Sequence, residues 1–493
     1  MRRMLTILIA VILIAVAAVP LWSASDGATV ENMDVSAPTV DLTADVPESF
    51  DMRDSYRVTP VKNQLNYGMC DMFTTAACLE QLLLREGYDE HDLSETYLAG
   101  SIFTGLGSPG GTGGDEVWAA EVPPEHSLGS YAWLSALTLI DWRTAPVDDD
   151  LAPLEDYEVG YVSDPSLADQ SVARITGFKI LNIEENPDAV KAMIMSGYAG
   201  SMMLDASGSF VIDGTYTCNV PFESPINHGV TLVGWDDNYP RDRFYLPAES
   251  DGAWLVKNSW GTSSGLYQGD GYMWVSYESS ILPMVLFYDS CEPVSESRHL
   301  YSYDHGVSIG SDMAFDRTAS MANVFTCDGD QVLDAVSITT FSVSDARYTV
   351  QVYTDLTDPS DPTSGTPMLA SPREGDIGPA GAYVIRIDDV HLTKGQTFSV
   401  AVTLESDGTV YVPLDTDEDE TLMGVAEYYS RPVASAGESF VLIDGQWSDV
   451  SADGSTNVRL KAYTTDEGSG TGITFAVAAV VLAAVAVGVA IRR

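Results

Sequence analysis

The sequence predicts an α+β domain followed by an all-β sandwich, with a long apolar segment at each end of the chain. A helical pattern at residues 70–87 is followed, from residue 228 onward, by short apolar runs typical of strands. Residues 299–465 carry many strand signals, few helical ones, and turns rich in Asp, Gly, Pro and Ser. A chain of 493 residues is too long for one ordinary hydrophobic core, so two or three domains are expected.

Both ends of the chain are apolar. Basic residues at positions 2 and 3 precede an apolar run and then small residues, which predicts a secretory signal over residues 1–25; its length also fits an uncleaved anchor. Residues 473–491 carry no charge, and as a helix they would span roughly 28 Å, enough to cross a bilayer. The two arginines that follow predict a cytoplasmic C-terminus.

The charge balance is strongly acidic. The chain has 72 acidic and 24 basic residues, a net charge of −48, and only six of the basic residues are lysines. A solvated carboxylate surface of this kind suits high salt, which screens its self-repulsion, or an acidic cell-surface protein at ordinary salt. The charge argues against nucleic-acid binding, because no basic patch is available to meet phosphates.

Residues 70–87 are predicted to form an amphipathic helix that begins at a cysteine. Its apolar arc consists of Phe73, Ala76, Ala77, Leu83 and Leu84. Gly87 ends the run. Cys70 would lie in the first turn, where the helix dipole and the free N–H groups favour a thiolate. The chain has five cysteines, so at least one thiol is free, with Cys70 the natural candidate; disulfides among the other four stay open.

Three short apolar runs, residues 230–233, 253–256 and 272–276, predict an antiparallel sheet packed against this helix, with a cleft between two lobes. A second helical stretch is predicted from Gly129 to Trp142. After residue 299 the strand signals fall at residues 336–343, 348–353, 383–387, 397–402 and 410–412, which favours a β-sandwich or jelly roll. An acidic run at residues 415–420 offers oxygen ligands for Ca²⁺ but lacks a glycine-turned loop, so no metal is expected.

Three residues stand in contexts that suit nucleophilic chemistry. Cys70 lies in the sequence GMCDMF, His228 in NHGVTL and Asn258 in KNSWG. An imidazole can hold a thiolate as an ion pair, and a side-chain amide can orient the imidazole. Gln64 stands six residues before the cysteine, where its side-chain N–H could join the Cys70 backbone N–H as an oxyanion hole.

The order and flanks of these residues resemble the papain-like cysteine peptidases, and among them the prokaryotic branch that carries a lectin-like domain after the peptidase. The sequences FDMRD at 50–54 and VTPVKNQ at 58–64 resemble the mature N-terminus of that branch. The sequence DLSE at 92–95 resembles the segment after the active-site helix, and GWDDN at 234–238 follows the histidine strand. The resemblance covers about residues 48–465.

This resemblance implies a catalytic set of Cys70, His228 and Asn258, with Gln64 in the oxyanion hole and Trp260 covering the hydrogen bond between the histidine and the asparagine. Gly129 stands where the family has a glycine pair that lines the cleft and binds substrate backbone. The resemblance further implies protein or peptide substrates, no cofactor, and a cell-surface glycan or protein as the ligand of the lectin-like domain.

The chain is accordingly expected to divide into six parts. These are a signal peptide (1–25), a flexible lead-in (26–47), a two-lobed α+β papain-like peptidase domain (48–298), a lectin-like β-sandwich domain (299–465), a linker (466–472) and a transmembrane anchor (473–491). This division predicts a single-pass protein with its ectodomain outside the cell.

The chain departs from the family at three positions. Tyr67 replaces a disulfide cysteine, Asp71 replaces the tryptophan after the nucleophile, and Ser264 replaces a second tryptophan near the asparagine. A carboxylate next to Cys70 opposes thiolate formation. The leading hypothesis is a surface-anchored cysteine endopeptidase. A catalytically silent surface protein that binds sugar or protein is the alternative, and acyl transfer between surface proteins is a third reading.

Overall fold

The computed structural model describes residues 40–102, 116–120, 131–156, 163–264, 267–306, 308, 312–341, 345–422 and 426–468. The predicted signal peptide, the predicted anchor at 473–491 and Gly129 lie outside these ranges. Within them, no helix combines the length and the apolar character needed to cross a bilayer.

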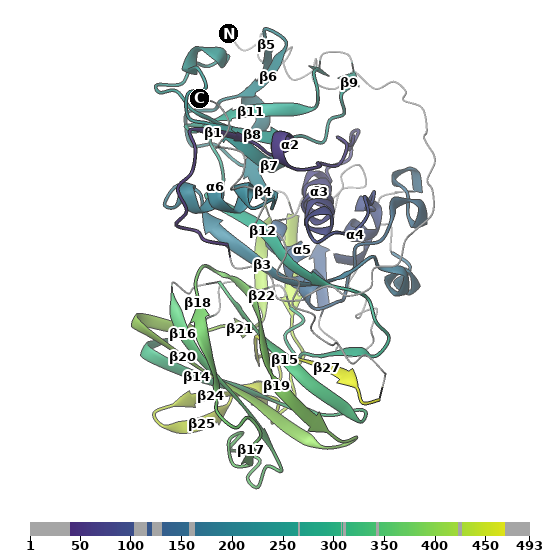
Figure 1. Cartoon of the computed structure of the whole chain (residues 1–493), viewed down its shortest axis with the longest axis vertical. Coiled ribbons are helices and arrows are strands. Elements are labelled where there is room, and N and C mark those ends of the chain that lie inside the picture. The colour runs from purple at the N-terminus through teal and green to yellow at the C-terminus, as the bar shows by residue number, and fades with distance from the viewer. Residues whose placement is uncertain are drawn as a thin grey trace, which may run out of the picture.

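Two bodies are stacked along the long axis of the molecule (Figure 1). We call the upper body, from β1 to β12, the first domain, and the lower body, from β13 to β27, the β-domain. The helices are α2 (Met52–Ser55), α3 (Cys70–Arg85), α4 (Glu95–Ile102), α5 (Ala132–Ile140) and α6 (Pro187–Met195). The strands of the first domain are β1 (Ser49–Asp51), β2 (Glu116–Ala120), β3 (Arg174–Asn182), β4 (Gly200–Leu204), β5 (Ser209–Ile212), β6 (Thr215–Cys218), β7 (His228–Asp236), β8 (Ala253–Lys257), β9 (Ser263–Ser264), β10 (Tyr267–Gln268), β11 (Tyr272–Ser276) and β12 (Met284–Glu292).

Helix α3 begins at Cys70, as predicted, and is the central helix of the first domain. Every residue from Cys70 to Leu83 is buried, because β4, β7 and β12 pack on one side of the helix and α4 and α5 on the other. The expectation of a single buried face was therefore wrong, since the polar residues Asp71 and Glu80 are buried as well. Gly87, with φ at +89°, turns the chain away after the helix.

The three apolar runs after residue 228 are confirmed as strands. They form β7, β8 and β11, which are antiparallel neighbours in that order. On the other side of β7 lie β4, β12 and β3, so the sheet of the first domain runs from β3 to β5. Its core includes the apolar face of α3 and buried side chains of β4, β7 and β12.

The β-domain is a two-sheet sandwich, as predicted. Its strands are β13 (Arg298–Tyr301), β14 (Met313–Thr326), β15 (Gln331–Thr340), β16 (Ala346–Thr354), β17 (Thr366–Pro367), β18 (Arg373–Ile377), β19 (Gly381–Leu392), β20 (Thr397–Val412), β21 (Leu414–Asp415), β22 (Glu418–Leu422), β23 (Ala426–Arg431), β24 (Ser439–Ile443), β25 (Gln446–Asp449), β26 (Asn457–Val458) and β27 (Leu460–Asp466). One sheet contains β13, β27, β15 and β19, the other contains β17, β16, β20, β14, β24 and β25, and a separate apolar core lies between them. The separate strand expected at 410–412 is wrong, because β20 runs without a break from Thr397 to Val412.

The two domains share one sheet. Strand β19 of the β-domain pairs with β3 of the first domain at Gly381–Lys179 and Ala382–Phe178. The resulting 13-stranded sheet runs from β13 through β19 and β3 to β5. A Cβ atom at residue 381 would overlap the carbonyl oxygen of Phe178, so the close approach of the two strands requires glycine there.

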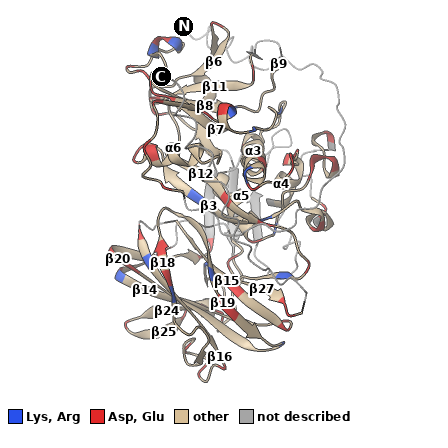
Figure 2. Ribbon diagram, viewed as in Figure 1, with Lys and Arg blue, Asp and Glu red and all other residues tan. Residues whose placement is uncertain are grey.

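All five cysteines are free and buried, so the disulfides left open by the odd count are not formed. Acidic side chains are spread over both domains, with Lys and Arg at fewer places between them (Figure 2). That distribution suits the solvated carboxylate surface expected from the composition. The choice between a high-salt and an ordinary cell-surface setting stays a prediction.

Candidate active site

Cys70 is the first residue of α3 and lies against the start of β7. Backbone N–H groups of Cys70 and Asp71, together with that of Gly229, stabilise the thiolate form of Cys70. A Cβ atom at Gly229 would lie 3.4 Å from the Asp71 nitrogen, so β7 and the first turn of α3 are in close contact there. Since Gly229 follows His228 directly, the helix start and the strand start bring the predicted nucleophile and base to one place.

His228 and Asn258 come from adjacent strands and are hydrogen-bonded. His228 Nε2 lies 2.8 Å from Asn258 Oδ1, and the same oxygen accepts the backbone N–H of Ser259 at 2.8 Å. Because that oxygen accepts from Ser259, Nε2 of the imidazole must be the protonated nitrogen, which leaves Nδ1 as a base. Trp260 stacks on the imidazole, with ring centroids 4.6 Å apart and planes at 21°.

Gln64 is held by the segment that follows Asn258. Its Oε1 accepts the Ser259 hydroxyl at 2.6 Å, and its Nε2 donates to the carbonyl oxygen of Tyr67 at 2.8 Å. The backbone N–H of Gln64 also donates to the Ser259 carbonyl at 2.8 Å. An amide nitrogen carries two hydrogens, so one remains for a developing oxyanion. Ser259 thus orients both amides of the site, a role that the sequence reasoning missed although this residue stands inside the quoted NSWG sequence.

Burial dominates the electrostatics of the cysteine and the histidine. Burial, and next the Asp71 carboxylate, raise the pKa of the Cys70 thiol to about 12. Burial lowers the pKa of His228 to about 4, against the hydrogen bond to Asn258, which acts in the opposite direction. Each group alone is therefore neutral at pH 7. A thiolate and an imidazolium formed together would offset the cost that each charge pays by itself.

A buried charge network anchors the two segments that carry Gln64 and Asn258. Glu80, on α3, accepts Lys62 Nζ at 2.7 Å and the Thr59 hydroxyl at 2.6 Å. The Thr59 oxygen in turn accepts Lys257 Nζ at 2.8 Å. Lys62 also pairs with Glu95 at 2.9 Å. One helix residue therefore fixes both strands of the site relative to the Cys70 helix.

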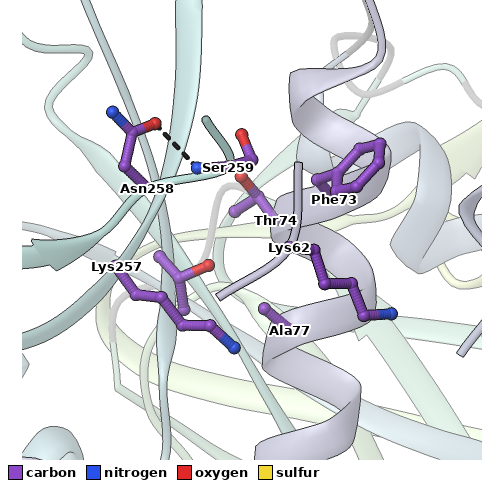
Figure 3. A pocket seen from close by; sticks show the side chains of 8 residues that line it. Lys62, Phe73, Thr74, Ala77, Lys257, Asn258 and Ser259 are labelled. Carbon is purple, nitrogen blue, oxygen red and sulfur yellow. Dashed lines mark hydrogen bonds between the residues drawn. The ribbon is translucent and has the colours of Figure 1, made fainter. Parts of the chain in front are cut away.

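Figure 3 shows how the side chains of this region lie around a small cavity. Lys62 and Lys257 flank the α3 side chains Phe73 and Ala77, and Asn258 lies above them. The cavity measures about 10 Å³, close to the room that one water requires. This space is too small for a substrate, so the residues around it support the site from behind.

An apolar pocket of about 10 Å³ lies on the other side of β7 from β8. Its lining includes Ala132, Trp133, Ile180, Met203, Leu282 and Leu286. Met203 is paired with Gly229 across β4 and β7, and directly paired residues share a face of the sheet. Gly229 faces the first turn of α3, so the pocket lies beside the nucleophile.

The structure thus brings Cys70, Gln64, His228, Asn258 and Trp260 together, and Gly129 lies outside the described residues. Helix α5 starts at Ala132, three residues after Gly129. In the acidic run, Asp415 is buried and paired with Arg459 at 3.0 Å. Among the described residues, no group of three or more His, Cys, Asp or Glu side chains is placed to hold a metal ion.

Two family models match the chain. "Papain family cysteine protease" matches residues 46–126 and 139–292, and "Lectin like domain" matches residues 300–464. The chain therefore carries a papain-family cysteine protease domain followed by a lectin-like domain.

Particular relatives fit this class. Cathepsin L2 of Homo sapiens is 27% identical over 248 residues, which is 48% of this chain and 63% of the relative, and procathepsin L of Rattus norvegicus is 29% identical over 240 residues, 47% of this chain and 61% of the relative. The chain thus spans less than two thirds of the length of these curated relatives.

A solved structure matches over both domains. The clostridial cysteine protease Cwp84 after propeptide cleavage is 25% identical, with a TM-score of 0.70 over 85% of this chain and 99% of that chain. A second structure, of the cysteine protease and lectin-like domains of Cwp84, "a surface layer associated protein of Clostridium difficile", is 24% identical, with a TM-score of 0.69 over 88% of this chain and 91% of that chain. The second likeness supports the two-domain fold.

Proposed function

We propose that this protein is a cysteine endopeptidase that hydrolyses peptide bonds of extracellular proteins through Cys70, His228 and Asn258. The observation that carries the proposal is the assembly at one point of the helix-start thiol, the imidazole bound through Nε2 to Asn258, and the Gln64 amide. The similarity to cathepsins and to a clostridial cysteine protease supports the same chemistry.

The proposed mechanism begins with proton transfer from the Cys70 thiol to Nδ1 of His228. The sulfur then attacks the peptide carbonyl, and the Gln64 amide and the Cys70 backbone N–H stabilise the oxyanion. His228 gives its proton to the leaving amine, which departs and leaves an acyl-enzyme. Water, with His228 as base, releases the acyl group and restores the thiol. Asn258 holds the imidazole in the tautomer that these steps require, and Trp260 covers that hydrogen bond from water.

The apolar pocket supports a preference for substrates with an apolar side chain near the cleaved bond. Ala132 and Trp133 form one wall, and Met203 and Leu282 form the opposite wall. Each buried CH₂ of a substrate side chain contributes about 0.8 kcal/mol, so such a pocket discriminates between apolar side chains and glycine.

One observation favours the alternative, a silent peptidase fold that serves in adhesion or binding. Asp71 is buried beside Cys70 and contributes to the raised pKa of the thiol. A protein in which that effect prevails would keep the fold and a glycan- or protein-binding β-domain without cleaving peptides.

The proposed setting is the cell surface. Domain limits of 48–298 for the protease and 299–465 for the lectin-like domain fit the two matched ranges. The surface-layer association of Cwp84 supports an extracellular site of action. A signal peptide at 1–25 and an anchor at 473–491 would hold the two domains outside the membrane, and the net charge of −48 suits a saline medium.

The proposal is tested by labelling with a biotinylated epoxide that alkylates thiolates in papain-like sites, at low and at multimolar salt. The wild-type protein should be labelled, and Cys70→Ala and His228→Ala should both lose the label while unfolding at the wild-type temperature. Peptide cleavage would then separate hydrolysis from acyl transfer, because transfer joins two peptides. A folded wild-type protein that takes no label at either salt would favour the silent binding protein.

A further inference from the structure

The apolar pocket has two walls of different origin. One wall comes from β4 and the segment after it, with Met203 in register with Gly229 and Leu282 bonded through its N–H to the Met203 carbonyl at 2.8 Å. This wall belongs to the sheet that carries His228. The other wall comes from α5, with Ala132 and Trp133, and from β3, with Ile180.

Helix α5 is tied to the β-domain at its far end. The helix starts with the pocket residue Ala132 and ends at Ile140, and its C-terminal cap is Asp141. The Asp141 carboxylate accepts Lys461 Nζ, from β27, at 2.5 Å. Lys461 also reaches Asp304 at 2.6 Å, and His305 Nδ1 lies 3.4 Å from the second Asp141 oxygen. A helix of nine residues spans about 14 Å, so this contact lies at the opposite end of α5 from the pocket.

The ion pair between the domains is fully buried. The side chains of Asp141 and Lys461 are each 1% exposed, and that of Asp304 is 0% exposed. Burial opposes the ionisation of Asp141, but Lys461 and then His305 outweigh it and hold the pKa of Asp141 well below its usual range. Charges paired in a low-dielectric interior hold their geometry closely, because separating them leaves each charge buried without its partner.

The residue after the cap strengthens the same junction. Trp142 has a φ of +56°, a strained conformation for a residue of this size. Its ring packs edge-on against Tyr463 of β27, with centroids 5.8 Å apart, and its Nε1 donates to the carbonyl of Ile175 in β3 at 3.2 Å. One side chain therefore joins α5, β3 and β27.

Strand β3, the second element of this wall, is held by the β-domain as well. The Ile180 N–H donates to the Ala380 carbonyl at 2.7 Å, just before the paired residues of β19. Lys179 Nζ lies 3.7 Å from the ring centroid of Tyr383. All the α5 and β3 residues that line the pocket thus lie on elements fastened to the β-domain.

We propose that the lectin-like domain sets the width of the apolar pocket, and that Lys461 and Asp141 are positioning residues for substrate selection that act through α5. The inference rests on the proposed peptidase function and deepens it. A shift of α5 changes the distance between the two pocket walls while leaving Cys70, His228 and Asn258 on α3, β7 and the segment after β8. Loss of the ion pair should therefore alter which side chain is accepted more than it alters the reactivity of the thiol.

The test compares two epoxide probes on the full-length protein in detergent micelles. One epoxide carries a leucine side chain and the other a glycine, and the readout is the ratio of their rate constants for alkylation of Cys70. Iodoacetamide, which has no side chain to place, reports the reactivity of the thiol itself. The variants are Lys461→Met and Asp141→Asn, which remove one charge each, and Lys461→Arg, which keeps the charge. Val402→Ala, in the β-domain core away from the junction, is the control for lost stability.

We expect the wild-type protein to favour the leucine probe. The ratio should fall about tenfold in Lys461→Met and Asp141→Asn, because a pocket reads one or two carbon groups at about this level. It should return to within twofold of the wild type in Lys461→Arg, with iodoacetamide rates equal in all variants. If Lys461→Met does not fold, Asp141→Asn decides, since its side chain keeps the original shape.

Two results would overturn the inference with the proposed function intact. One is a wild-type ratio in both folded charge variants, and the other is an equal fall in Val402→Ala. A wild-type protein that reacts with iodoacetamide but with neither epoxide would instead overturn the proposed function, and this inference with it.

Discussion

Replacing Asp71 by Asn should make Cys70 more reactive. Asp71 is the second residue of α3, it is 2% exposed, and its carboxylate is the second contribution, after burial, to the raised pKa of the Cys70 thiol. Asparagine has nearly the same shape and carries no charge. The substitution therefore removes a like charge from the thiolate and leaves its burial unchanged, so the pKa of Cys70 should fall.

The size of this effect follows from Coulomb's law. Side chains of neighbouring residues in a helix turn lie roughly 7 Å apart, and at an effective dielectric constant of about 20 two unit charges then repel by roughly 2 kcal/mol, or about 1.5 pKa units. The thiolate fraction at pH 7 should rise about 30-fold. A less basic thiolate is also a weaker nucleophile, with a Brønsted slope near 0.45, so the net gain in alkylation rate is about sevenfold.

The assay is iodoacetamide alkylation between pH 5 and 9, with the Cys70 peptide quantified by mass spectrometry and the Cys70→Ala protein as background. Asp54→Asn, which removes an exposed carboxylate from α2, controls for the change in net charge. The loss of an acid near a helix N-terminus should lower the free energy of unfolding by less than about 1 kcal/mol. An Asp71→Asn profile that coincides with the wild type, or that moves to higher pH, would refute the reasoning.

Three further predictions concern other contacts. Asn258→Ala removes the acceptor 2.8 Å from His228 Nε2, and peptide hydrolysis should show kcat/KM lower by about 10²-fold with the unfolding temperature nearly unchanged. Burial raises the pKa of Glu95 to about 7 from its ordinary 4.5, so its contribution to stability is present below pH 4.5 and is lost as the pH rises through 7. Urea unfolding should therefore show the wild type losing roughly 3 kcal/mol between pH 4.5 and 8 relative to Glu95→Gln; parallel curves would contradict this. Gly381→Val places a side chain on the Phe178 carbonyl, so calorimetry should show one unfolding transition in the wild type and two in the variant.

The parts of the site that the sequence predicts are those set by local chemistry. Cys70 at a helix start, His228 at a strand start and Asn258 before a tryptophan each depend on a few neighbouring residues. Gln64 was predicted as an oxyanion donor from its spacing, but its Ser259 partner is 195 residues away and emerges only in three dimensions.

The features that the sequence did not predict depend on contacts between distant segments. Glu80 was expected on the exposed side of an amphipathic helix, yet it is buried because Lys62 and Thr59 reach it from another segment. Ser406 and Gly408 indicated a turn between two strands, but the extra residues are absorbed where β14 and β20 shift register near Asp316. The shared sheet rests on two residue pairs about 200 positions apart, which no local pattern specifies.

The shared sheet also decides how this chain can be cut. A protease domain ended near residue 298 would turn β3 from an inner strand into an edge strand, with the N–H of Ile180 and its neighbours open to another chain. The matching lectin-like fragment would expose β19 in the same way. Open strand edges recruit each other between molecules, so separately expressed halves should aggregate or reassociate. Proteolysis in the connecting segment would for the same reason leave a nicked but still assembled protein.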